Sequence, residues 1–469
     1  MGVLEDLLAH EAQILLQMQE LSCSLARTRT RIAEVRNVNW NTITYNLPNE
    51  TLSAIFEAGV SSTSYTRTVS PVSCFGSKPQ IPFEILISSV SRRWRNVALQ
   101  TPRLWTDLQI IVSKPVEDLI DLYLHRSKMY LLDITFKEVL QGNPKHNPDQ
   151  DLDRKNFIRH LGRLIPHVAR WRTLVIEDIR VGGLSAALSP LSDLSSPALE
   201  RLRVHCFDTA PAIIEVFSGG APLLSSLESC GTYILPPCDN IKSLEIGRCF
   251  RLLPHKEFAR LMRPMRSLTH LSLFSGLVYD SFHPPIVLLA VLSLELYPIN
   301  SSVGLLRFLD LPAIESLTVH GSTECVILAF THHDQCYPAL HTLKISSRKN
   351  QTYQETYQMS APTTTRNFIA LFPIVREVTL DGANSTPILH ALQNSEPLWP
   401  QLSLITIISP SGANSSSQKQ VWDNIVKVVD NRLELKLPIS RIRLSSQILK
   451  GLTHRQQQGL RAKVTLEEC

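Results

Sequence analysis

The sequence predicts a mixed α and α/β protein with an N-terminal heptad helix, a small all-α domain and an α/β solenoid. Three observations support this prediction. Apolar residues recur every seven positions near the N-terminus, helical periodicity follows to about residue 105, and a short leucine-rich pattern then repeats along most of the chain. The expected parts are a heptad helix or coiled coil at 1–36, a helical domain at 37–113, a connecting segment at 114–153, a solenoid at 154–450 and a C-terminal tail at 451–469.

Residues 4–35 follow a heptad register in which eight of ten seam positions are apolar. Glu11 and Thr28 are the two exceptions. A helix with so narrow an apolar stripe needs a partner, which is either its own domain or a second copy of the chain through self-association. One set of seam positions is Leu4, Glu11, Met18, Leu25 and Ile32, and the other is Leu7, Ile14, Leu21, Thr28 and Val35.

A second helix is predicted to begin at Leu47-Pro48, because proline is tolerated in a first helical turn and Glu50 supplies the negative charge that this end favours. Leu52, Ile55 and Phe56 then share one helical face. Residues 61–80 are rich in Ser, Thr and Pro and have no periodicity, so a flexible insertion is expected near 57–80.

Helical patterning resumes near Ile81 and includes Val90–Leu99, where Val90, Trp94, Val97 and Ala98 are expected to face inward. Thr101-Pro102 has the form of an N-cap followed by a first-turn proline. Trp94 and Trp105 are predicted to join this domain to a first strand at 108–112, because large aromatic side chains between layers usually belong to a core.

The remaining chain repeats a pattern of apolar residues spaced three and then two apart, usually after a proline. The spacing is compatible with leucine-rich repeats of 20–29 residues, each contributing a short strand to a shared core. Near the end, 418–429 is predicted as a helix and 433–437 as a strand. The repeating segments begin at Trp171, Pro197, Leu268, Pro312, Pro338, Pro373 and Pro400, and Leu227, Leu244 and Leu294 fill gaps between them.

The Leu47–Leu108 segment resembles an F-box, through its Leu-Pro opening with Ile55-Phe56, its Val-Ser-Arg-Arg-Trp-Arg helix and its Thr-Pro-Arg-Leu-Trp segment. The insertion at 57–80 departs from the compact pattern. The whole arrangement is similar to the F-box-like families abundant in mushroom-forming fungi. The resemblance implies a non-enzymatic substrate receptor of a Skp-cullin-F-box ubiquitin ligase, in which a Skp-type adaptor links the chain to a cullin and the repeats bind an unknown target protein.

The resemblance also assigns the adaptor contact to Leu47, Pro48, Leu52, Ile55 and Phe56, because burial of such an apolar cluster drives association. Ordinary core packing is the alternative for Leu52 and Ile55. If adaptor docking has been lost, the chain is instead a solenoid scaffold that self-associates through 4–35.

Signatures of enzymes are missing from the sequence, which contains no GxSxG, GxxxxGK[ST], HExxH or GxGxxG motif. No catalytic residue and no cofactor is therefore expected. Cys325, His332, His333 and Cys336 have the residue types of zinc ligands, but no two cysteines lie two to four residues apart. No metal site is expected there.

Overall fold

The computed structural model contains two compact units, Met1–Thr106 with Arg126–Lys128, and Asp107–His125 with Met129–Cys469. The residues that it describes are 2–39, 47–68, 81–138, 150–179, 184–206, 213–249, 253–274, 278–279, 284–297, 308–321, 323–330, 336–346, 362–381, 385–394, 396–408 and 415–469.

The first unit is helical in its described residues. The heptad segment forms one long helix, α1. Helix α3 runs to Thr68, so 57–68 of the predicted insertion is helical rather than flexible, while 69–80 lies outside the described residues. The elements are α1 (Gly2–Asn39), α3 (Asn49–Thr68), α4 (Phe83–Ser88), α5 (Arg92–Gln100) and the 3-10 helix η1 (Pro102–Trp105).

The two tryptophans of the F-box-like segment differ in burial, because Trp94 is half-buried whereas Trp105 belongs to the core. The ring of Phe56 lies 5.0 Å from that of Trp94, between centroids. Trp105 is fully buried, and its Nε1 donates to the carbonyl of Ala98 at 2.9 Å. Arg126 places its guanidinium carbon 4.3 Å from the centre of the Trp105 ring. Trp105 is thus a core residue, as predicted.

Two local predictions in this unit are wrong. Val90 is 54% exposed because it lies in the turn before the N-cap Ser91, whose hydroxyl accepts a hydrogen bond from the Trp94 amide at 3.1 Å. The Thr101 hydroxyl does not cap η1. It donates instead to the carbonyl of Val97 at 2.8 Å and contacts the Ser53 hydroxyl at 2.8 Å, which ties the end of α5 to α3.

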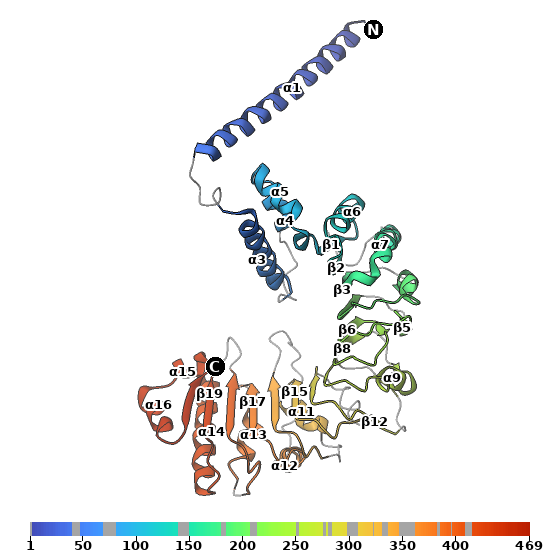
Figure 1. Cartoon of the computed structure of the whole chain (residues 1–469). Helices are drawn as coiled ribbons and strands as arrows, with labels where there is room; N and C mark the ends of the chain where they lie inside the picture. The colour runs from blue at the N-terminus through green and yellow to red at the C-terminus, as the bar shows by residue number, and fades with distance from the viewer. Residues whose placement is uncertain are drawn as a thin grey trace. The chain divides into compact units, whose positions relative to one another are not determined.

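The second unit contains a 14-stranded sheet whose paired strands are all parallel and follow one another in chain order (Figure 1). The sheet strands are β1 (Asp107–Ile111), β2 (Leu132–Lys137), β3 (Trp171–Ile179), β4 (Arg201–Cys206), β6 (Ser226–Gly231), β8 (Ser243–Cys249), β10 (His270–Leu273), β13 (Ser293–Leu296), β15 (Ser316–His320), β16 (Thr342–Ser346), β17 (Glu377–Asp381), β18 (Leu404–Ile408), β19 (Arg441–Leu444) and β20 (Thr465–Glu468).

Helices and short strand pairs connect these strands. The helices are α6 (Glu117–Arg126), α7 (Gln150–Leu164), η2 (Ile165–Arg170), α8 (Leu184–Leu188), η3 (Ser189–Leu191), α9 (His255–Met262), α11 (Thr323–Phe330), α12 (Pro362–Ala370), α13 (Thr386–Ala391), α14 (Ser415–Glu434), α15 (Ser446–Lys450) and α16 (His454–Arg461). The short strands β5 (Ile213–Glu215), β9 (Leu253–Pro254) and β12 (Ile286–Val287) pair with β7 (Tyr233–Leu235), β11 (Val278–Tyr279) and β14 (Leu309–Asp310).

The spacing of the repeated apolar residues explains the sheet, because alternate residues of a strand point to opposite faces. The two leucine-type positions of each repeat are buried, as Leu174 and Ile176 are in β3 at 0% exposure. A chain of short parallel strands stacked in sequence order is a mixed α/β, solenoid-like architecture, as the repeat pattern predicts.

The sheet extends beyond the predicted solenoid at both ends. The segment expected to connect the parts contributes β2 and the start of α7, and β1 already belongs to the sheet through its register with β2. The expected tail contributes β20, which pairs with β19. Residues 433–437 are not a strand, because α14 continues to Glu434 and the Arg432 side chain then binds the Leu437 carbonyl.

Candidate functional site

The open face of the parallel sheet is the most extensive candidate site. One residue from each strand forms a continuous row across all 14 strands, and every member of the row is half-buried. Along the strands, the residues before and after a row member point into the core, so the row itself lies on the opposite face of the sheet. In order, the row contains Gln109, Thr135, Val175, Arg203, Glu228, Glu245, Ser272, Glu295, Thr318, Lys344, Thr379, Thr406, Arg443 and Glu467.

The middle of the row is acidic. Glu228 is next to Glu245 in the register, and Glu295 follows across the single residue Ser272. Glu228 pairs with Arg203, and its Oε1 lies 2.6 Å from Nε2 of His205. Burial raises the pKa of Glu228, but the His205 interaction and the Arg203 charge outweigh it, so that the pKa falls below its usual value.

Glu245 differs from its two neighbours, because it has neither a hydrogen bond nor an ion pair with any described side chain. Burial, followed by the negative charges of Glu228 and Glu295, raises its pKa. Because a cation placed beside this carboxylate would offset the repulsion by its acidic neighbours, the centre of the row favours positively charged groups.

An aromatic stack borders the acidic row at the carboxyl ends of β10, β13 and β15. The rings of Phe274 and Tyr297 are stacked with centroids 3.8 Å apart, and the rings of Tyr297 and His320 follow at 4.3 Å. The Tyr297 hydroxyl donates to Glu295 at 3.0 Å, and Nε2 of His320 lies 2.6 Å from the same oxygen. The His320 interaction, opposed by burial, lowers the pKa of Glu295. Aromatic rings and carboxylates therefore form one surface, which we call the acidic–aromatic strip.

The sequence contains a signal for this strip that sequence analysis did not use. Glu228, Glu245 and Glu295 each follow a buried leucine, namely Leu227, Leu244 and Leu294, which were recognised only as fillers of the repeat pattern. The variable residue between the two apolar positions of a repeat always points to the open face, so three Leu-Glu pairs at equivalent positions predict an acidic row.

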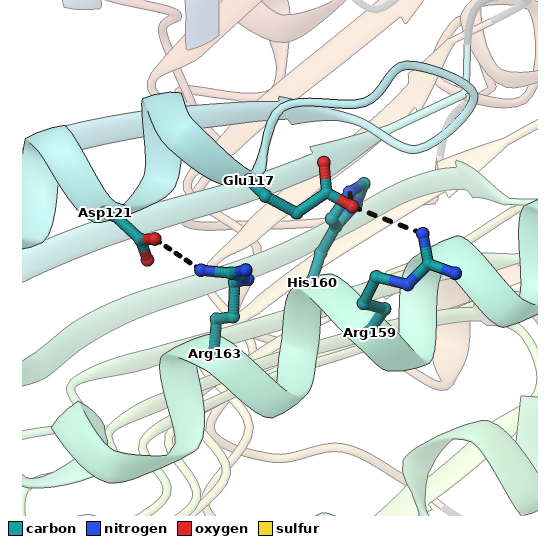
Figure 2. Close-up of polar contacts among 5 residues, drawn as sticks. All are labelled: Glu117, Asp121, Arg159, His160 and Arg163. Carbon is teal, nitrogen blue, oxygen red and sulfur yellow. Dashed lines mark hydrogen bonds and ion pairs between the residues drawn. The ribbon is translucent and has the colours of Figure 1, made fainter.

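A second polar cluster joins α6 to α7 (Figure 2). Glu117 contacts Arg159 at 3.3 Å, and Asp121 pairs with Arg163. His160 is fully buried beneath them, and its Nε2 lies 3.7 Å from Glu117, beyond hydrogen-bond distance. Neither ring nitrogen has a hydrogen-bond partner within the described part of the chain. Burial, opposed by the charge of Glu117, lowers the pKa of His160 and so favours its neutral form.

The five residues assigned to adaptor contact divide into two groups. Leu52 and Phe56 are each only 1% exposed, so their side chains belong to the core of the first unit. Ile55 is 49% exposed, Pro48 is exposed and Leu47 is half-buried. Arg93 binds the Leu47 carbonyl and so fixes the chain where α3 begins.

The outward side of α3 carries an apolar stripe that sequence analysis assigned only in part. Ala54 and Ala58 are exposed beside Ile55, and Pro48 is exposed before the first turn of the helix. Ala58 is four residues from Ala54 and three from Ile55, so these three share a helical face, and Pro48 precedes Ile55 by about two turns. We call these four residues the α3 stripe.

Comparisons with known proteins do not identify this chain. No protein-family model matches it, and no curated protein matches its sequence. One solved structure, a protein from Bacteroides fragilis, is similar over 50% of this chain and 66% of its own length, with 11% sequence identity and a TM-score of 0.27.

Two further observations concern the described residues. None of their helices is long and apolar enough to cross a membrane. None of their His, Cys, Asp and Glu side chains group in threes as metal ligands would. His332 and His333, which have the residue type of zinc ligands, lie outside the described residues.

Proposed function

We propose that this protein is a substrate receptor, in which the F-box-like unit binds a Skp-type adaptor and the open sheet face binds a target protein. The observation that carries the proposal is the open row of 14 half-buried side chains, because a face this long and this varied can recognise an extended protein surface. No catalytic role is assigned to any residue.

The adaptor contact is reassigned from the predicted five residues to the α3 stripe. Leu52 and Phe56 are buried beneath this stripe, and the ring of Phe56 packs against that of Trp94. Pro48 and Ile55 are the apolar groups that a partner would bury, and a cluster of this kind contributes most when it is fully desolvated at the centre of an interface.

The target contact is assigned to the acidic–aromatic strip. Glu245, which has no ion pair with a described side chain and lies beside Glu228 in the row, fits a target segment that carries Lys or Arg side chains. Carboxylates attract such side chains.

Co-purification of the full chain with a Skp-type adaptor tests the adaptor contact. Ile55→Asp should abolish the complex, because it places a charge in the centre of the stripe. Val287→Asp is the matched control, since Val287 is 52% exposed in the second unit and lies outside the stripe. Retention of the complex by Ile55→Asp, or absence of any complex with the native chain, would contradict the assignment.

A self-associating scaffold is the second candidate function, and the exposure of α1 favours it. Leu7, Leu21 and Val35 of the heptad seam are 61%, 70% and 54% exposed. Sedimentation of the chain with 1–36 deleted separates the candidates. A scaffold should become monomeric, whereas an adaptor-dependent receptor should keep its adaptor.

A further inference from the structure

Helix α1 exposes every side chain that the structure describes, at 6–32 and at 35. At 1.5 Å per residue its 38 residues extend about 57 Å. The exposed apolar residues include Ile14, Met18 and Ile32, at 44%, 60% and 48%. A helix of this length that buries none of these side chains is only marginally stable in water, so a partner helix is required.

The two interruptions of the seam determine which orientation a pair of α1 helices prefers. In a parallel pair each seam residue faces its own copy, so Glu11 would face Glu11 in a layer of like charges. In an antiparallel pair the two seam positions of the heptad face each other. Residues whose numbers sum to 39 then share a layer, and Glu11 lies opposite Thr28.

That register places both polar positions in the same layer and leaves the other layers apolar. The Thr28 hydroxyl already donates to the Ser24 carbonyl at 3.0 Å, so it enters the layer without an unsatisfied donor. The apolar layers are Leu7 with Ile32, Ile14 with Leu25, and Met18 with Leu21. Leu4 would pair with Val35, although the Leu4 side chain lies outside the described residues.

Charge along α1 is also complementary in the antiparallel orientation. The first half carries Glu5, Asp6, Glu11 and Glu20, whereas the second half carries Arg27, Arg29, Arg31 and Arg36 with the single acidic residue Glu34. An antiparallel partner sets the acidic half of one helix beside the basic half of the other. It also brings three arginines within one turn of the layer that contains Glu11.

We infer that α1 binds α1 of a second copy in an antiparallel pair with Glu11 opposite Thr28. Such a contact is isologous, so that each layer occurs twice in the dimer. The inference rests on self-association, the second candidate function, and adds its orientation. The two chains then leave the paired helices at opposite ends, about 57 Å apart.

Disulfide trapping in the full chain tests the orientation. Leu7→Cys and Ile32→Cys are each made with the exposed Cys23 changed to serine, and the two variants are mixed under mild oxidation. The antiparallel pair should give a 7–32 cross-link in the mixture, identified by peptide mass spectrometry. Leu7→Cys alone should give no 7–7 cross-link, and such a cross-link would overturn the proposed orientation.

A charge substitution provides an independent readout that does not require cross-linking. Glu11→Lys should raise the dimer dissociation constant about tenfold, because it places two new cations beside the partner arginines. Glu20→Lys makes the same charge change outside the seam and should alter it less than about threefold. In a parallel pair Glu11→Lys would only exchange one like-charge layer for another, so an unchanged constant would contradict the orientation. A native chain that sediments as a monomer would contradict self-association itself and leave adaptor docking unaffected.

Discussion

The buried Arg432 side chain near the end of α14 gives the sharpest prediction of stability. It is 2% exposed, and its guanidinium donates to the carbonyls of Leu437, Leu398 and Trp399 at 3.1, 3.0 and 3.1 Å. Trp399 has a positive φ of 46°, a strained conformation that these contacts hold in place. Burial lowers the pKa of Arg432.

Arg432→Met removes all three hydrogen bonds and leaves three carbonyls without their donor. Each hydrogen bond to a charged group contributes about 1.5–3 kcal/mol, and relief of the buried charge offsets part of the sum. We expect a loss of about 3 kcal/mol in the free energy of unfolding. Arg432→Lys should recover little, because an ammonium cannot span three fixed carbonyls.

Urea denaturation with hydrogen exchange at 398–437 measures the effect on the second unit. Arg443→Met is the matched control, since Arg443 is 39% exposed and pairs on the surface with Glu467. That variant should lose less than about 1 kcal/mol. If the free energy of unfolding of Arg432→Met lies within about 1 kcal/mol of the native value, the three carbonyl contacts do not stabilise this part of the second unit.

Three further predictions concern the sheet and its acid sensitivity. Gly231→Ala should lower the free energy of unfolding in urea by more than about 2 kcal/mol. The φ angle of Gly231 is +82°, and an added Cβ would lie 1.7 Å from the Cys206 carbonyl oxygen. Gly459→Ala is the control and should not destabilise the protein, because open space surrounds that position. Because the pKa of His160 is lowered in the folded protein, its contribution to stability is complete above its unfolded-state pKa near 6.5 and decreases as pH falls below that value. His160→Leu should therefore reduce the fall in melting temperature between pH 6.5 and 5. An unchanged fall would exclude His160 as its source. Glu245 has a raised pKa, so Glu245→Gln should raise the melting temperature at pH 7 but not at pH 4, and equal shifts at both pH values would point to packing instead.

The sequence predicts the sheet because its determinants are local and repeated. Buried pairs such as Leu343 and Ile345 recur at the spacing of a strand, so each strand is visible within five residues. The second strand β2 and the last strand β20 lie outside the segments where the repeat was recognised, although β2 alternates between buried and half-buried residues along its whole length.

The candidate sites depend on information that periodicity does not contain. The pattern at Leu52, Ile55 and Phe56 places them near one helical face, but only the packing of α4 and α5 determines which of them is buried. The acidic row is similar, because Glu228 and Glu245 are 17 residues apart in the chain and become neighbours only through the register of β6 and β8. Long-range pairing, rather than local propensity, creates both surfaces.

Substitutions at the α3 stripe and at the acidic–aromatic strip should differ in their effect on stability. The α3 stripe rests on a small core in which Phe56 and Trp94 are in direct contact, so changes beneath it should reduce binding and stability together. The acidic–aromatic strip lies on strands whose opposite face is fully buried, so Glu245 and Tyr297 can change without loss of the Leu-rich core. Single residues of the row can therefore change while the sheet and the first unit remain intact.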